Sequence, residues 1–179
     1  MASASKQVLD GPSIQRALSR MAHEILEKNK GGEKLALIGI QTRGVVLAAR
    51  LHQAIEAING LKVPTGILDI NLYRDDLTLV SEHPILKKTE INFDLDGLSV
   101  VLVDDVLYTG RTVRAALDEC ADFGRPRRIL LCVLIDRGGR ELPIQADIVG
   151  MTVGTRPGDR VDVFVSELDG RDAVELVRG

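Results

Sequence analysis

Two adjacent carboxylates and a threonine–glycine turn lie close together in the stretch VVLVDDVLYTGRT, residues 100–112. An apolar run ends at Asp104 and Asp105, and TGRT follows after a short spacer. Threonine hydroxyls, backbone N–H groups and the positive end of a following helix suit a phosphate monoester. The two carboxylates suit the hydroxyls of a ribose or the water shell of Mg²⁺. The stretch therefore predicts a site for a phosphorylated sugar, with its phosphate in the turn and its diol on the acids.

Neither half of this pattern is specific by itself. Thr-Gly turns are common, and paired aspartates at the end of a strand often only cap a helix. The stretch is neither a Walker A loop nor a Rossmann fingerprint, because it lacks the glycine spacing of both. The combination of acids and turn between a buried strand and a helix is much rarer, and it makes this stretch the leading candidate site.

The segments around this stretch alternate between apolar strands and helices. Strands are expected at 34–40, 63–73, 98–104 and 128–135, and helices within 12–32, at 44–60 and at 111–123, with Ser13 as the cap of the first helix. Strands that are apolar along their length and alternate with helices predict an α/β fold with a parallel sheet covered on both faces. Ligands of such sheets bind beyond the carboxyl ends of the strands, where the two aspartates fall.

Two segments depart from this alternation. Residues 74–90 are polar and lack clean periodicity, and a long irregular segment of this kind is typical of a mobile lid. Near the C-terminal end, apolar residues alternate at 161–165 and again at 174–176, on either side of Asp169-Gly170. This second pattern predicts a β-hairpin.

Length and composition favour one globular domain without a membrane segment. The chain has 179 residues, of which 45% are hydrophobic and 27% charged. No apolar stretch approaches the roughly 18 residues that cross a bilayer, and the start lacks a signal peptide, so we expect a cytoplasmic protein. The net charge of −3 argues against a protein held on nucleic acid by its overall charge, although it allows a local basic patch. Cys120 and Cys132 are expected to be buried thiols.

The stretch at 100–112 resembles the motif that binds phosphoribosyl pyrophosphate (PRPP) in type I phosphoribosyltransferases. VDDVLYTGRTVRAALDE is most similar to the pyrimidine operon attenuator/uracil phosphoribosyltransferase family, PyrR. The resemblance extends through RALSRMAHEILEKNKG, IGIQTRGVVLAARL, LDINLYRDDL and DFGRPRRILLCVLIDRGGRELPIQADIVG. It implies the type I phosphoribosyltransferase fold as one domain over 1–179, with a flexible lid at about 74–90, a small hood at about 136–159 and the C-terminal hairpin.

The resemblance also assigns roles by position. Asp104 and Asp105 are expected to hold the ribose hydroxyls of PRPP directly or through waters on Mg²⁺, and with Arg43 they form the predicted catalytic set. QTRG at 41–44 matches the pyrophosphate loop of the family, although Arg43 taken alone would be interpreted as a surface arginine. The predicted PRPP contacts are Thr42, Arg43, Gly44, Arg74, Asp104, Asp105, Val106, Leu107, Tyr108, Thr109, Gly110, Arg111 and Thr112.

The base is expected at the start of the hood. Asp136 and Arg137 begin this segment in the family pattern, and the open alternative is a structural salt bridge between the two. Tyr108 stands where hypoxanthine-type relatives carry an aspartate that is proposed to handle the purine N7 proton. The resemblance therefore favours a pyrimidine base over a purine.

The implied reaction is displacement of pyrophosphate from C1 of PRPP by N1 of uracil, which gives UMP. Its oxocarbenium-like transition state would be stabilised by Mg²⁺ and arginine on the leaving diphosphate, and no residue of the sequence is an obvious general base. The implied partners are PRPP, uracil, UMP and further copies of the chain in a homodimer or a larger homo-oligomer.

Regulatory members of this family bind pyrimidine-operon mRNA when UMP is bound. The cations expected to contact RNA are Arg16, Arg20, Lys28 and Arg140, while neutral residues stand at four usually basic or imidazole positions, Gln41, Gly139, Gln145 and Met151. Arg16 and Arg20 also fit the solvated face of an amphipathic helix. Two alternatives to the bifunctional interpretation stay open: a UMP-sensing regulator with little activity, and a salvage enzyme that does not bind RNA.

Overall fold

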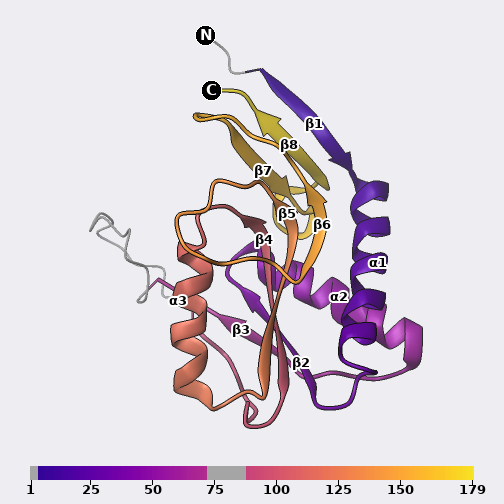
Figure 1. Ribbon diagram of the computed structural model, residues 1–179. Helices are drawn as coiled ribbons and strands as arrows, with labels where there is room; N and C mark the ends of the chain where they lie inside the picture. Colours follow the sequence, from indigo (N-terminus) through magenta and orange to yellow (C-terminus); the bar gives the residue numbers. More distant parts are fainter. Residues whose placement is uncertain (1–3, 72–87) are drawn as a thin grey trace.

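The computed structural model describes residues 4–71 and 88–179, and these residues contain a five-stranded parallel sheet (Figure 1). The sheet has the order β3-β2-β4-β5-β6. Its strands are β2 (Leu35–Ile40), β3 (Thr65–Leu68), β4 (Ser99–Leu107), β5 (Arg128–Asp136) and β6 (Ile148–Thr152). The expected α/β architecture is confirmed, and β4 occupies the centre of the sheet.

Helices cover both faces of this sheet because its strands are apolar on both sides. Val101 and Val103 on β4 pack in one cluster with α1 (Gly11–Lys28) and α2 (Arg43–Asn59). Val100 and Leu102, which point the other way, pack in a second cluster with α3 (Arg111–Cys120). Successive side chains of a strand face opposite sides of the sheet, so β4 is buried between the two helical layers (Figure 1).

A second, antiparallel sheet is formed by both ends of the chain. It has the order β1-β8-β7, with β1 (Ser5–Asp10), β7 (Arg160–Phe164) and β8 (Ala173–Val177). The predicted C-terminal hairpin is confirmed, although its connection contains the short helix α4 (Ser166–Asp169) instead of a tight turn. Sequence reasoning missed β1, which begins at Ser5 and continues directly into α1.

Other expectations need correction. The cap of α1 is Asp10 and not Ser13, because the backbone N–H of Ser13 donates to Asp10 Oδ1 at 2.8 Å. Within the described part of the strand expected at 63–73, residues 63–71, only β3 forms, and the amide of Asp69 just beyond it donates to Thr89 Oγ1 at 2.9 Å instead of continuing the ladder. Sequence reasoning also missed β6, which lies within the range assigned to the hood. Most of the predicted lid, residues 74–87, lies outside the described residues.

Both cysteines are buried free thiols, as expected. Burial raises the pKa of the Cys120 thiol to about 12, so this thiol is inert at neutral pH. In the part of the chain that the structure describes, no helix combines the length and apolarity that a membrane span requires.

Glu119 on α3 carries a buried carboxyl group, with 5% of the residue's surface exposed. Thr89 Oγ1 donates to its Oε1, while Oε2 has no hydrogen-bond partner among the described residues. Burial raises the pKa of Glu119, and the nearby carboxylates of Asp69 and Asp122 raise it further. The hydrogen bond from Thr89 lowers the pKa, but burial outweighs it, so the folded protein binds this proton more tightly than the unfolded chain does.

Glu119→Gln is expected to make stability less dependent on pH above the ordinary pKa of a glutamate. Because the folded pKa is raised, the native state holds a proton that the unfolded state has released, and stability falls as pH rises through the folded pKa. Urea unfolding at pH 5 and pH 8 measures this effect. The free energy of unfolding of the variant, relative to that of wild type, should be higher at pH 8 than at pH 5. Glu27→Gln, an exposed glutamate on α1, is the control. An equal change in both variants would contradict the assignment.

Candidate functional site

The two aspartates lie at the carboxyl end of the central strand. β4 continues to Leu107, so Asp104 and Asp105 are held within the strand instead of following it. Asp104 is 7% exposed, and its Oδ1 accepts the N–H of Asp105 at 2.9 Å. Asp105 Oδ1 accepts the N–H of Val106 at 2.8 Å. Pairing of β4 with β5 thus fixes both carboxylates at the edge where ligands of parallel sheets bind.

The turn after β4 leads directly into α3. Gly110 is the N-cap of this helix and has a φ of 93°, which favours glycine. The N–H of Arg111 donates to Thr109 Oγ1 at 3.2 Å. The backbone N–H groups at the start of α3 and the helix dipole therefore meet at the turn, as the phosphate prediction requires.

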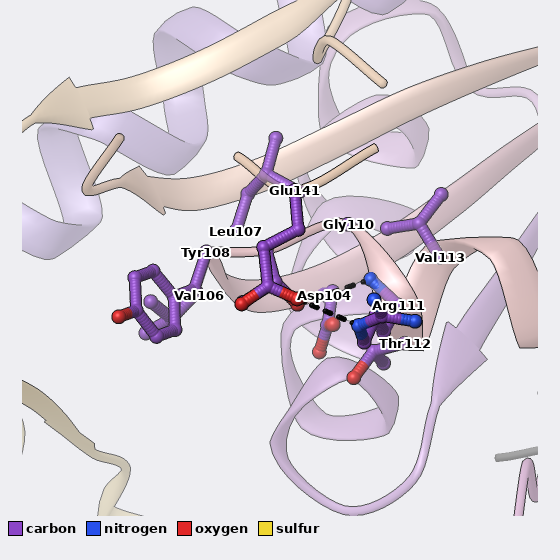
Figure 2. A pocket seen from close by; sticks show the side chains of 10 residues that line it. Asp104, Val106, Leu107, Tyr108, Gly110, Arg111, Thr112, Val113 and Glu141 are labelled. Carbon is purple, nitrogen blue, oxygen red and sulfur yellow. Dashed lines mark hydrogen bonds and ion pairs between the residues drawn. The ribbon is translucent and has the colours of Figure 1, made fainter. Parts of the chain in front are cut away.

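A cavity of about 370 Å³ joins Asp104 to this turn, and Asp105 does not line it (Figure 2). It is lined by Asp104, residues 106–113 and Glu141. Glu141 was missed by sequence reasoning, and its Oε2 accepts a hydrogen bond from Arg111 Nε at 2.7 Å. An anion in the turn would share Arg111 with this carboxylate. The signal for Glu141 was weak, because it stands in a polar loop thirty residues further along the chain.

The Thr-Arg-Gly loop approaches the same aspartates from β2. Thr42 is the N-cap of α2, and the peptide bond before it is cis. A Cβ on Gly44 would lie 2.4 Å from the carbonyl oxygen of Val103 and 3.2 Å from the Cα of Asp104. Only a residue without a side chain permits this contact, so Gly44 brings the loop and the aspartates together.

Arg43 makes an ion pair outside the aspartate pocket. Its Nη2 donates to Asp169 Oδ1 at 2.8 Å, and Asp169 ends α4, which connects β7 to β8 of the second sheet. A hydrogen bond from the N–H of Val165 and the guanidinium of Arg43 lower the pKa of Asp169. Sequence reasoning missed Asp169 as a partner, since it is 126 residues away. The C-terminal hairpin therefore holds the side chain of the loop arginine.

The predicted base residues have separate partners, and the alternative of a mutual salt bridge is wrong. Asp136 pairs with Arg140 at 2.6 Å; burial opposes ionisation, but the bonds from Arg140 and Gly138 lower the pKa of Asp136 overall. Arg137 is buried, donates to the carbonyl oxygen of Asp159 at 2.7 Å, and lies 3.8 Å from the centre of the Tyr108 ring. Asp136 and Tyr108 thus border the end of β4, next to the cavity.

The four cations expected to contact RNA are held by different parts of the molecule. Arg16 donates to Ser13 Oγ at 3.0 Å, and Arg20 donates to the carbonyl oxygens of β6. Arg140 is engaged by Asp136 at the carboxyl end of β5, whereas the carbonyl of Lys28 accepts from Arg128 at its amino end. Arg74, the remaining predicted PRPP contact, lies outside the described residues.

A parallel sheet with paired aspartates and a Thr-Gly-Arg-Thr turn at its carboxyl edge is the arrangement expected of a phosphoribosyltransferase. The phosphoribosyl transferase domain family matches residues 4–165. Within that class the chain belongs to the PyrR family. It is 58% identical over 170 residues to the "Bifunctional protein PyrR" of Thermus aquaticus, with 95% of this chain and 94% of the relative covered. It is 55% identical to that of Pelotomaculum thermopropionicum, with 99% and 98% covered.

Solved structures of more distant proteins share the fold. A hypoxanthine phosphoribosyltransferase of Trypanosoma cruzi superposes with a TM-score of 0.73 at 20% identity, covering 97% of this chain and 96% of that one. A hypoxanthine-guanine-xanthine phosphoribosyltransferase gives 0.69 at 16% identity, covering 97% and 94%. At this identity the likeness extends to the fold alone.

Proposed function

We propose that this chain transfers the phosphoribosyl group of PRPP to uracil, giving UMP and pyrophosphate, and regulates a pyrimidine operon through RNA. The observation that carries the catalytic part is the cavity in which Asp104 and the anion turn face each other (Figure 2). Membership of the PyrR family supports the choice of uracil and the regulatory part. Homo-oligomer formation stays a prediction.

PRPP is proposed to lie with its 5′-phosphate in the turn at 109–112 and its ribose hydroxyls on Asp104 and Asp105. The N-terminus of α3 stabilises the phosphate through backbone N–H groups and the helix dipole. The carboxylates accept hydrogen bonds from the diol. Because β4 is buried on both faces, the backbone that carries the aspartates is held in place before the substrate binds, and this preorganisation favours catalysis.

Mg²⁺ fits the same end of the site. Magnesium keeps most of its waters and uses one or two carboxylates together with substrate phosphates, which matches the pair Asp104 and Asp105. These two residues would hold the ion through water, and the ion supplies charge stabilisation to the diphosphate. The loop at 42–44 is proposed to stabilise the remaining negative charge on the leaving group. For this, Arg43 must either turn from Asp169 toward the diphosphate or contact both anions.

The base is proposed to lie between Tyr108 and the start of the hood. Tyr108 has 46% of its surface exposed and is backed by the guanidinium of Arg137. A tyrosine at this position offers no carboxylate to a purine N7 proton, which supports a pyrimidine. Asp136 and Arg137 are held by partners of their own, so they shape the base pocket through backbone groups near Gly138.

A panel of bases tests the substrate. Uracil, orotate, hypoxanthine and guanine are each incubated with the protein, PRPP and Mg²⁺, and release of pyrophosphate is measured. We expect release with uracil only, and none when Mg²⁺ is removed with a chelator. Turnover with a purine and none with uracil would refute the proposal.

A further inference from the structure

Five basic residues surround a hollow at the amino ends of the strands, far from the aspartate pocket. They are Lys28, Lys30, Lys34, Arg127 and Arg128, and we call them the amino-edge cluster. The hollow has a volume of about 490 Å³ and is also lined by Asn29 and Glu33. In a chain whose net charge is −3, five cations with one carboxylate form a pronounced local excess of positive charge.

The charges of this cluster are not neutralised within the described part of the chain, where none of the five forms an ion pair. Neutral oxygens instead hold the two arginines in place. Arg128 donates to Ser99 Oγ at 3.0 Å and to the carbonyl of Lys28 at 2.6 Å, and Arg127 donates to the same hydroxyl at 3.3 Å. By contrast, Arg50 on α2 is paired with two carboxylates. The arginines of the cluster are therefore ordered while their charge stays available to an anion.

The loop between α1 and β2 presents the lysines in an unusual backbone conformation. Lys30 and Lys34 have φ values of 54° and 52°, a left-handed region that residues with side chains rarely adopt. The buried side chain of Asn29 fixes this loop by donating to the carbonyls of Gly31 at 2.7 Å and Glu33 at 3.0 Å. Such backbone conformations concentrate at ligand sites, and here they place two cations on the rim of the same hollow.

The cluster is separated from the phosphoribosyl site by the length of a strand. Arg128 begins β5 and Asp136 ends it, so eight residue steps place the two edges about 26 Å apart. In Figure 1 the loop after α1 lies at the bottom of the view, whereas α3 begins at the upper end of the sheet. A ligand at the cluster therefore leaves the phosphoribosyl site accessible, and a nucleotide can be bound at the same time.

We propose that the amino-edge cluster binds the sugar–phosphate backbone of RNA, an inference that rests on the regulatory part of the proposed function. Five cations spread around an open hollow suit successive phosphates along a strand better than one compact anion. Arg140, by comparison, is already engaged by Asp136. The cluster thus supplies the phosphate contacts that Arg140 and the neutral positions Gln41, Gly139, Gln145 and Met151 do not.

Salt dependence of RNA binding tests this assignment. The double variant Lys30→Asn/Lys34→Asn removes two charges with a residue that tolerates the left-handed backbone. Filter binding to a transcript of the pyrimidine-operon leader, with UMP, gives the slope of log K against log salt. Each lost contact to single-stranded RNA reduces this slope by about 0.7, so we expect a reduction of about 1.4 and weaker binding at every salt concentration. Uracil transfer should be unchanged.

Lys62→Gln/Arg160→Gln is the matched control, because it removes two exposed cations elsewhere and leaves the net charge of the two variants equal. A slope equal to that of wild type in both variants would overturn the proposal, as would wild-type protein that does not bind the transcript. Displacement of the RNA by inorganic phosphate at constant ionic strength would assign the cluster to a small anion and also overturn it. If the wild-type protein binds RNA as expected but does not transfer phosphoribose to uracil, only the catalytic proposal is refuted.

Discussion

Asp105→Asn lowers kcat/KM for PRPP by about 10²–10³-fold, while the protein folds as before. The carboxylate of Asp105 lies at the end of β4 beside Asp104, and among the described residues it accepts a hydrogen bond from its neighbour Val106. The asparagine carbonyl can still accept this bond, so the backbone is preserved. The variant loses the negative charge that is proposed to hold Mg²⁺ and the ribose diol. This loss raises the energy of the transition state most, because charge develops there on the leaving diphosphate.

Steady-state rates at varied PRPP, with circular dichroism of the same samples, measure this effect. Asp162→Asn is the matched control, because it removes one carboxylate from the second sheet without touching the cavity. We expect full activity from the control. Unchanged turnover in folded Asp105→Asn protein would show that the proposed ligand placement is wrong.

The core of the fold was predictable because its signals are local. The runs at 34–40, 98–104 and 128–135 are apolar on both faces. A strand that is apolar on both faces has to be covered on both sides of the sheet. The acids and the turn at 104–112 were likewise found from spacing alone, since one strand end and one helix start position all of them. Resemblance to a family supplied the identity of the ligand, which spacing could not.

What the sequence did not reveal depends on contacts between distant segments. β1 has little apolar periodicity, and it forms because β8, at the other end of the chain, offers an unpaired edge. Arg43 pairs with Asp169, 126 residues away, and Arg111 pairs with Glu141, 30 residues away. Both carboxylates lie in segments whose sequence is typical of polar loops. Lys28 and Arg140 were assigned to one basic face, whereas the length of β5 separates their surroundings.

Gly44→Ala is expected to damage the site and the fold together, because Gly44 is the point where the loop at 42–44 touches the central strand. The added methyl group would lie 2.4 Å from the carbonyl oxygen of Val103, which belongs to the backbone of β4 and cannot turn aside. Either the first turn of α2 moves outward or β4 shifts. Overpacking of this kind costs about 1–3 kcal/mol, which urea unfolding measures.

The same substitution is expected to reduce uracil transfer about 10²-fold, because displacement by about 1 Å is enough to misalign reacting groups. Moving α2 outward carries Thr42 and Arg43 away from Asp104, so the defect should appear in kcat as well as in KM for PRPP. Gly154→Ala is the control: its methyl group would meet nothing within 4 Å and its backbone is not left-handed. Wild-type stability and activity in Gly44→Ala would show that the loop is not fixed against β4. They would also contradict the proposal that the pyrophosphate loop and the aspartates form one site.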